Sequence, residues 1–213
     1  MPRRTRPPKL EFDGAYFSGS ATLPAWAGFG AGERSRRAPK VMIESEVAFD
    51  VLDALGEDED PELSPAQLET LDELVRDQDV IRDAALGAVF EQYPDLRDRY
   101  LPHLEDPGSM PELGDAKGLR RLVGLKSICL HRVELSDRAY FGLILSCTWD
   151  GEHDLGVMMH GTRVVDVGGG DTAVLAWIAE RDARKQKGAT GKRPSSRRKA
   201  SKKKAPAGKR SRR

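Results

Sequence analysis

The sequence predicts an α+β fold: a mainly antiparallel sheet with two or three helices on one face, followed by a disordered basic C-terminal tail. Apolar residues alternate with polar ones in the N-terminal part, recur at helical spacing over residues 64–93, and form mostly apolar runs joined by turn residues over residues 125–149. From Gly188 to Arg213 there is no Leu, Ile, Val, Phe, Tyr or Trp. This last segment therefore cannot bury enough apolar surface to offset the loss of chain entropy on folding.

The N-terminal part predicts strands. Residues 10–17 alternate in polarity and predict a first strand, and residues 23–29, interrupted by Gly and Pro, predict an irregular second one. The clearest signal covers residues 41–51, where the odd positions are almost all apolar and the even positions include three acids. Residues 56–63 predict an acidic loop.

Two helices are predicted next. Ser64, Pro65 and Gln67 form a helix start, with Ser as the N-cap, Pro in the first turn and Gln closing a capping box. An apolar stripe at helical spacing follows, made of Leu68, Leu71, Leu74 and Val75. The second helix is expected over residues 79–93 and should end before Pro94, because proline interrupts a helix.

The last part of the folded region predicts a meander and a final helix. Residues 125–149 should form one hairpin that turns near Ser136, and residues 155–167 a second. Asp171 is then expected to cap a helix over residues 172–185.

Two cysteines, Cys129 and Cys147, are too few for a disulfide framework. The first hairpin would place Cys129 opposite about Ile144 and not opposite Cys147, so we expect two small core residues of a cytoplasmic protein. No apolar run approaches the roughly 20 residues of a membrane span, and no apolar stretch follows the basic N-terminus as in a secretory signal. We therefore expect no membrane association.

The net charge of +1 conceals a separation of sign along the chain. Residues 181–213 hold sixteen Lys or Arg and one acid, whereas residues 11–180 hold fifteen Lys or Arg and thirty-three acids. Composition thus divides the chain into three parts. They are a disordered basic leader (1–8), a single acidic α+β domain of unknown function (9–180) and a disordered Lys/Arg-rich tail (186–213).

The tail is a candidate for non-specific nucleic-acid association. Its positive charge would attract the phosphate backbone without reading bases, and it has no aromatic residue for stacking. Its composition resembles the Lys/Ala/Pro/Ser tails of bacterial linker-histone-like proteins. The alternative is a solubilising tail that folds back on the acidic domain. The candidate contacts are Lys192, Arg193, Arg197, Arg198, Lys199, Lys202, Lys203, Lys204, Lys209 and Arg210.

Ionisable groups crowd into CTWDGEHDLGVMMH (147–160). Carboxylates and imidazoles together could bind a divalent metal or carry out acid–base chemistry, but neither the zinc-peptidase helix motif nor a calcium loop is present. The alternative is a turn between strands, anchored by Trp149 and Leu155, in which Asp150 and His153 bond the turn's own backbone. We expect this structural or recognition role, with no metal and no cofactor. The candidate binding residues are Trp149, Asp150, Glu152, His153, His160 and Asp171.

The run CTWDGEHDLGVMMHGTRVVDVGGGDTA resembles the signature of an uncharacterised bacterial family with a domain of unknown function. Its proteins carry an aromatic-Asp-x-Glu-His-x-x-Gly pattern, then a basic hairpin and a Gly-x-x-Asp. Gly151 and Asp154 stand where that pattern has an acid and a Gly. The family is similar to immunity and toxin-neighbourhood proteins, and the resemblance implies no catalytic residue. The matching positions are Trp149, Asp150, Glu152, His153, Gly156 and Asp171.

Two further patterns could carry chemistry. Three glycines at 168–170 lie between a predicted strand and helix, where backbone N–H groups can hold phosphate, but the spacing of a dinucleotide fingerprint or P-loop is absent. We expect a tight turn there. The potential nucleophiles all fall inside predicted strands without a nucleophile elbow, so we expect them to be inert. They are Ser127, Ser146, Cys129 and Cys147.

Two function hypotheses follow. The first is a non-enzymatic binding protein whose acidic domain recognises a protein partner, in the manner of an immunity protein, while its tail associates loosely with nucleic acid. The alternative is a metal-assisted hydrolase that uses Asp150, Glu152, His153 and His160.

Overall fold

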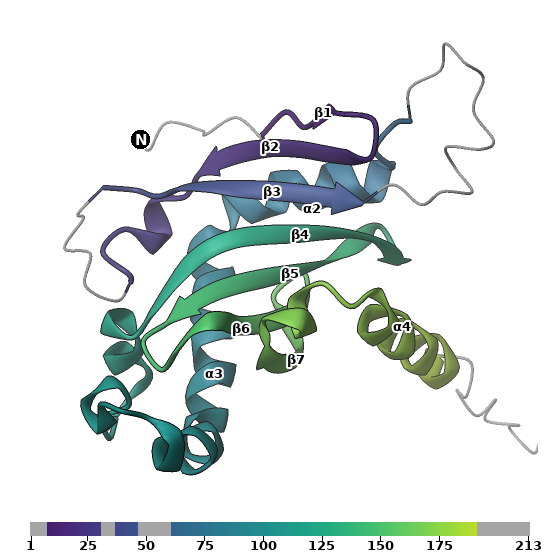
Figure 1. Ribbon diagram of the computed structural model, residues 1–213. Coiled ribbons are helices and arrows are strands. Elements are labelled where there is room, and N and C mark those ends of the chain that lie inside the picture. Colours follow the sequence, from purple (N-terminus) through teal and green to yellow (C-terminus); the bar gives the residue numbers. More distant parts are fainter. Residues whose placement is uncertain (1–7, 31–36, 47–60, 191–213) are drawn as a thin grey trace, which may run out of the picture.

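The computed structural model describes residues 8–30, 37–46 and 61–190 and confirms an α+β fold. Seven strands form one sheet in chain order, and every neighbouring pair is antiparallel except β3 and β4 (Figure 1). The strands are β1 Glu11–Phe12, β2 Tyr16–Thr22, β3 Lys40–Glu46, β4 Val123–Leu135, β5 Arg138–Cys147, β6 Asp150–His160 and β7 Arg163–Gly169. The α-helices are α2 Pro65–Arg76, α3 Gln78–Tyr100 and α4 Ala176–Thr190. Short 3₁₀ helices are η1 Pro24–Trp26, η2 Leu101–His103, η3 Pro107–Ser109, η4 Ala116–Arg121 and η5 Gly170–Ala173.

The prediction of one continuous strand over residues 10–17 is wrong, because these residues form two strands that are joined in a hairpin. The carboxylate of Asp13 accepts hydrogen bonds from the backbone N–H groups of Ala15 (3.2 Å) and Tyr16 (2.9 Å), and Gly14 has a φ of +102°. This local turn reverses the chain between β1 and β2. The irregular strand predicted over 23–29 is also wrong, since Pro24 begins η1.

Strand β3 confirms the period of two in its described part. Val41, Ile43 and Ser45 are buried, whereas the residues between them are exposed. Residues 47–60, which include the end of the predicted strand and most of the predicted acidic loop, lie outside the described residues. The long connection through α2 and α3 returns the chain to the end of the sheet at which β3 begins, which permits the parallel pairing of β3 with β4.

Helix α2 starts at the predicted capping box. The Ser64 hydroxyl accepts from Gln67 N (3.1 Å), and the Gln67 side chain accepts from Ser64 N (2.9 Å). The predicted apolar stripe is wrong at Leu68, which is 53% exposed. Polar side chains take part in the buried face instead: Thr70 accepts from Ala139 N at 3.0 Å.

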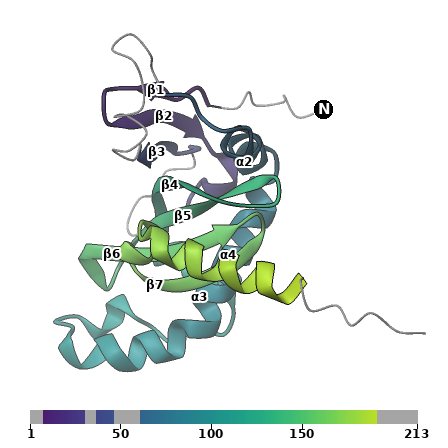
Figure 2. The same ribbon diagram turned by 90° about the vertical axis from the view of Figure 1, so that its right-hand side faces the viewer.

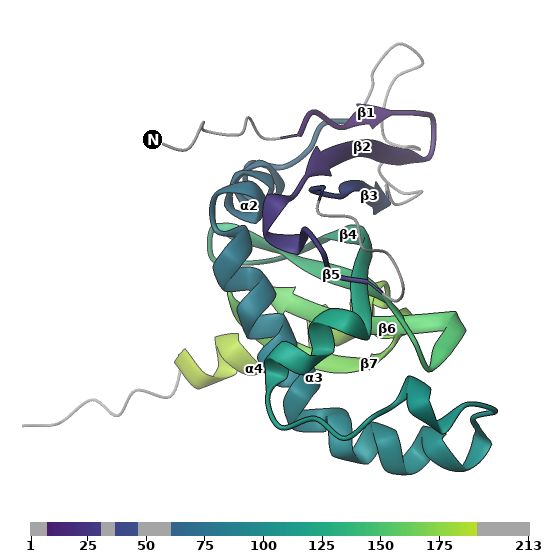
Figure 3. The same ribbon diagram turned by 90° about the vertical axis from the view of Figure 1, so that its left-hand side faces the viewer.

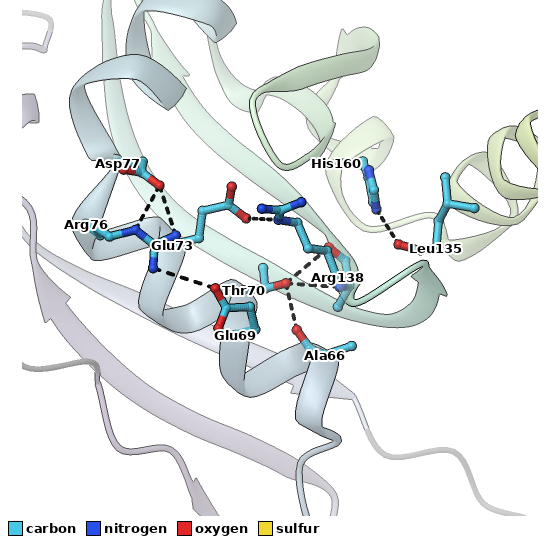
Figure 4. Close-up of polar contacts among 10 residues, drawn as sticks. Ala66, Glu69, Thr70, Glu73, Arg76, Asp77, Leu135, Arg138 and His160 are labelled. Atoms are coloured by element: carbon cyan, nitrogen blue, oxygen red, sulfur yellow. Dashed lines mark hydrogen bonds and ion pairs between the residues drawn. The ribbon is translucent and has the colours of Figure 1, made fainter.

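A second polar contact anchors α2 next to the first. Glu73, one turn beyond Thr70, pairs with Nε of Arg138 at 2.7 Å (Figure 4). Both contacts join α2 to the beginning of β5, so this helix is tied to the sheet by hydrogen bonds as well as by apolar packing.

Helix α3 continues through Pro94 to Tyr100, so its predicted end at residue 93 is wrong. Proline removes one backbone hydrogen bond, but the residues around it are held by tertiary contacts. The Tyr93 hydroxyl donates to Pro111 O (2.8 Å), Arg97 Nε donates to Met110 O (2.9 Å), and Leu96 is buried.

The sheet has helices on both faces. Phe141 and Met159 belong to the main core with α2 and α3, which lie behind the sheet in Figure 1. Their neighbours Tyr140 and Met158 point to the other face, because side chains alternate along a strand, and they pack with Ile178 of α4. We call the face opposite α2 and α3 the outer face; Figures 2 and 3 show the two sides of this layered arrangement.

Segment η5 brings α4 onto the outer face. The predicted role of Asp171 as the N-cap of this helix is wrong: Asp171 lies inside η5, and its backbone carbonyl accepts from Val174 N and Leu175 N, both at 3.0 Å. The carbonyl of Ala173 accepts from Nε2 of His131 (2.9 Å). Burial lowers the pKa of this imidazole, which keeps it neutral and able to serve as a donor in the interior.

Glycine makes this contact with η5 possible. A Cβ atom on Gly142 of β5 would lie 1.9 Å from Ala173 O, and one on Gly156 of β6 would lie 2.8 Å from Ala173 N. No heavy atoms can approach so closely, so the backbone of η5 rests directly on the backbone of the sheet.

Helix α4 is fastened at its middle. Asp182 accepts from the Tyr140 hydroxyl (2.7 Å) and pairs with both terminal nitrogens of Arg163. The helix runs to Thr190, so the first residues of the predicted 186–213 tail are helical. Residues 1–7 and 191–213, with all ten candidate nucleic-acid contacts from Lys192 to Arg210, lie outside the described residues. No helix in the described ranges is long and apolar enough to cross a membrane.

We predict that Gly142→Ala lowers the free energy of unfolding by about 3 kcal/mol or more, because the new methyl group collides with rigid backbone. Thermal and urea unfolding measure this. Gly87→Ala is the control: no atom lies within 4 Å of its Cβ position in α3, so it should be neutral or stabilise by up to about 1 kcal/mol. Similar losses in both variants would contradict the close contact.

Candidate functional site

Asp150 organises the hairpin that carries the predicted motif. Its Oδ1 accepts from His153 N (2.9 Å) and Glu152 N (3.3 Å) and lies 3.0 Å from Nδ1 of His153. Burial works against ionisation, but these hydrogen bonds prevail and lower the pKa of the carboxyl group. Asp150 therefore bonds the backbone of its own turn, as the structural interpretation of the motif predicts, while His153 bonds Asp150.

The turn between β5 and β6 is shorter than predicted, since it consists of Thr148 and Trp149, and the residues from Asp150 on already belong to β6, with a register shift between Asp150 and Leu155. Trp149 and Leu155 are both buried and flank this irregular part. Trp149 is 5% exposed, and its ring meets the Tyr93 ring of α3 edge-on at 5.8 Å. Asp154 has a φ of +59°, a conformation that favours Gly, at the position where the resembled pattern has Gly. Its carboxylate pairs with Lys126 Nζ at 2.7 Å. The irregular part thus keeps its left-handed residue although Asp stands there.

The structure does not bring His160 to this turn. Ten residues of β6 separate it from Asp150, which corresponds to roughly 30 Å along a strand. Its Nε2 donates to Leu135 O at 3.0 Å (Figure 4). Its ring lies against that of Tyr140, and burial lowers its pKa. Asp171 is held in η5. Within the described ranges, no three His, Cys, Asp or Glu side chains are grouped to hold a metal ion. The four residues of the hydrolase hypothesis therefore do not form one site.

The tight turn predicted for the glycine-rich segment is wrong in place, since Gly168 and Gly169 end strand β7 and Gly170 begins η5. Cβ atoms on Gly168 and Gly170 would lie 2.4 Å from Thr172 Oγ1 and from His153 O. These glycines are explained by the close approach of η5 to its neighbours and not by a ligand.

Both thiols have raised pKa values, because burial brings Cys129 and Cys147 to about 11. Both are therefore protonated at neutral pH. They do not face each other, since Cys129 lies opposite Gly142. The predicted partner Ile144 instead lies opposite Ser127, because the register shifts between Leu130 and Glu134. Both cysteines are free. Cys147 is a core residue as predicted, but the prediction is wrong for Cys129, which is only partly buried and lines a surface groove.

A surface that the sequence motifs did not indicate lies on the outer face beside α4. Helix α4 and η5 cover the outer face over β5 and β6, but no described element covers it over β2 and β3 (Figure 1). Tyr16 and Met42 are 47% and 45% exposed there. A groove of about 400 Å³ runs between this open half and α4. Its lining is Glu46, Cys129, Leu130, His131, Arg132, Val133, Val174, Ala176 and Glu180.

The groove combines an apolar lining with an acidic rim. Glu46 comes from β3 and Glu180 from α4, while Glu44, on the same face, lies opposite Cys129. Val174 contributes apolar surface that is 45% exposed. Arg132 is the one cation among the lining residues. Such a groove is suited to an extended segment with cationic side chains and apolar contacts.

A larger hollow of about 800 Å³ lies between η1, α3 and η4. Two arginines enclose Phe29, with guanidinium carbons 5.8 Å (Arg82) and 5.3 Å (Arg120) from its ring centre. Arg82 also donates to Ala25 O, and Arg120 to Ala27 O and Gly28 O. These cations hold the η1 segment in place, so we interpret this hollow as structural.

The comparison with protein families identifies the domain. A family model, Domain of unknown function (DUF6985), matches residues 30–175. The chain belongs to this family. The DUF6985 region runs from before β3 through η5 and ends immediately before α4, so it contains the motif hairpin and most of the groove. No curated protein and no solved structure matches the chain.

No pattern in the sequence predicts the groove. Exposed acids at alternate positions of a strand, such as Glu44 and Glu46, are usually a solvated face. The groove forms only because α4 packs on residues of β5 and β6 that are distant in sequence and so comes to lie beside Glu46.

We predict that Asp150→Ala lowers the free energy of unfolding by about 1–2 kcal/mol, because it leaves the turn's N–H groups without their acceptor. Glu152→Ala, at an exposed position of the same turn, should stay within about 0.5 kcal/mol. Chemical denaturation compares the two. If Glu152→Ala proves as costly as Asp150→Ala, the turn is not organised by Asp150.

Proposed function

We propose that this DUF6985 protein is a non-enzymatic binding protein whose acidic domain docks a basic segment of a protein partner. The observation that carries the proposal is the groove between β3–β4 and α4, with acids on two separate elements and exposed apolar surface between them. Acids on such a rim favour a cationic partner over a neutral one, and the apolar lining adds affinity that salt does not screen.

The C-terminal segment supplies the second activity, non-specific association with nucleic acid. Residues 191–213 contain twelve Lys or Arg and no acid. They follow directly from α4, whose last turns already carry exposed cations. Neutralising phosphates with these side chains releases counterions, so binding should depend steeply on salt and little on sequence.

We further propose a bacterial, immunity-like role in the cytoplasm. An acidic surface can occupy the nucleic-acid site of a basic nuclease toxin, and the free cysteines suit a reducing compartment. This proposal rests on analogy of charge. A gene for a basic nuclease directly beside the gene for this chain would support it.

For the groove, we predict that Glu46→Lys/Glu180→Lys weakens binding of a fluorescent Lys-rich peptide about tenfold at low salt, measured by anisotropy. Glu91→Lys/Glu112→Lys is the matched control with the same net charge. Glu112 pairs with Arg97 at 3.5 Å, much as Glu180 pairs with Arg184 at 3.6 Å. Equal weakening in both variants would mean that the peptide senses the overall field and that the groove is not its site.

For the tail, we predict that the full chain retards duplex DNA at about 50 mM salt and releases it by about 200 mM, whatever the DNA sequence. A chain ending at Thr190 retains all of α4 and should not bind. A full-length variant with Lys202, Lys203 and Lys204 changed to Gln tests charge at constant length and should show a shallower salt dependence. Retention of duplex binding by the chain ending at Thr190 would refute the assignment to the tail.

A further inference from the structure

Helix α4 displays an unusual exposed aromatic residue. Trp177 is 50% exposed, whereas the other two tryptophans, Trp26 and Trp149, are 2% and 5% exposed. Its neighbours Ile178 and Ala179 supply the buried face of the helix, so Trp177 is not needed to fill the core. A large aromatic ring left in solvent on a rigid helix is a common feature of binding surfaces.

Trp177 begins a stripe of cationic residues. Arg181 and Arg184 lie four and seven residues further on, on the same side of the helix. The Arg181 guanidinium lies 5.0 Å from the centre of the Trp177 ring, and the Arg184 side chain is 72% exposed. The arginines pair with Asp166 (3.1 Å) and Glu180 (3.6 Å). Both are exposed ion pairs, which contribute little and can be exchanged for phosphate contacts.

The stripe also leads into the basic segment. Trp177 lies about 20 Å from the end of α4 at Thr190, and residues 191–213 with their twelve cations follow. A polyanion held by that segment would be close to the stripe. The tail has no aromatic residue, so Trp177 provides the ring that base stacking needs.

We propose that Trp177, Arg181 and Arg184 are a nucleic-acid subsite that gives the protein a preference for single strands. An unpaired base stacks on the free face of the Trp177 ring, and the two arginines contact the flanking phosphates. A paired base is already stacked on both sides and cannot use the ring without unstacking. The proposal rests on nucleic-acid binding by the tail and adds the class of nucleic acid that is preferred.

The test uses the full chain with oligo(dT) and a duplex of equal length, measured by anisotropy. Trp177→Ala should weaken oligo(dT) binding about tenfold and change duplex binding by less than about twofold, and Trp177→Phe should recover part of the loss. Leu68→Ala removes a comparably exposed apolar side chain (53%) from α2, on the opposite face of the sheet, and is the control, with no effect expected on either ligand. Quenching of tryptophan emission by oligo(dT) provides a direct readout, because the other two tryptophans are buried.

Failure of the Trp177 subsite and failure of nucleic-acid binding by the tail give different results in this experiment. If the full chain binds both ligands and Trp177→Ala changes neither, the subsite is refuted while the tail's role stands, and Trp177 belongs to a protein-contact surface. Equal losses for oligo(dT) and duplex would also refute stacking. If the full chain binds neither ligand, the tail's proposed function fails and the subsite fails with it.

Discussion

The fold depends on a backbone-to-backbone contact at the centre of the outer face. The Ala173 carbonyl occupies the space where a side chain on Gly142 would be, and it accepts a hydrogen bond from His131. This contact places η5 on the sheet and sets the point from which α4 departs. The covered and open halves of the outer face, and the groove between them, follow from that position.

Helix α4 carries two adjacent surfaces of different character. Ala176 and Glu180 complete the apolar groove with its acidic rim, and Trp177 and two arginines lie beside them on the exposed side of the helix. Glu180 belongs to both surfaces, since it lines the groove and pairs with Arg184. The ion pair between Glu180 and Arg184 thus joins the acidic rim of the groove to the basic stripe on one helix.

Local patterns in the sequence were sufficient for most of the elements. The capping box at Ser64, the alternation in β3 and the two C-terminal hairpins depend on neighbours in sequence, and all were predicted. One error occurred where tertiary contacts outweigh local preference: Pro94 stays inside α3 because Tyr93 and Arg97 are bonded to residues 110–111. Another was a local signal that the alternation concealed, since Asp13 and Gly14 form a turn that makes residues 10–17 a hairpin. The predicted bonding of Asp150 to the backbone of its immediate neighbours is confirmed, but the predicted turn is wrong in extent, because β6 already begins at Asp150.

The sequence by itself determined the class of fold, the ends of several elements and the separation of charge between the domain and its C-terminal segment. These properties follow from composition and short-range periodicity. The tertiary structure alone decided that His160 lies far from Asp150, that α4 crosses the outer face, and that Glu46 and Glu180 share a groove. Each of these depends on pairing between strands and on a close glycine contact, which bring together residues that no pattern in the sequence connects.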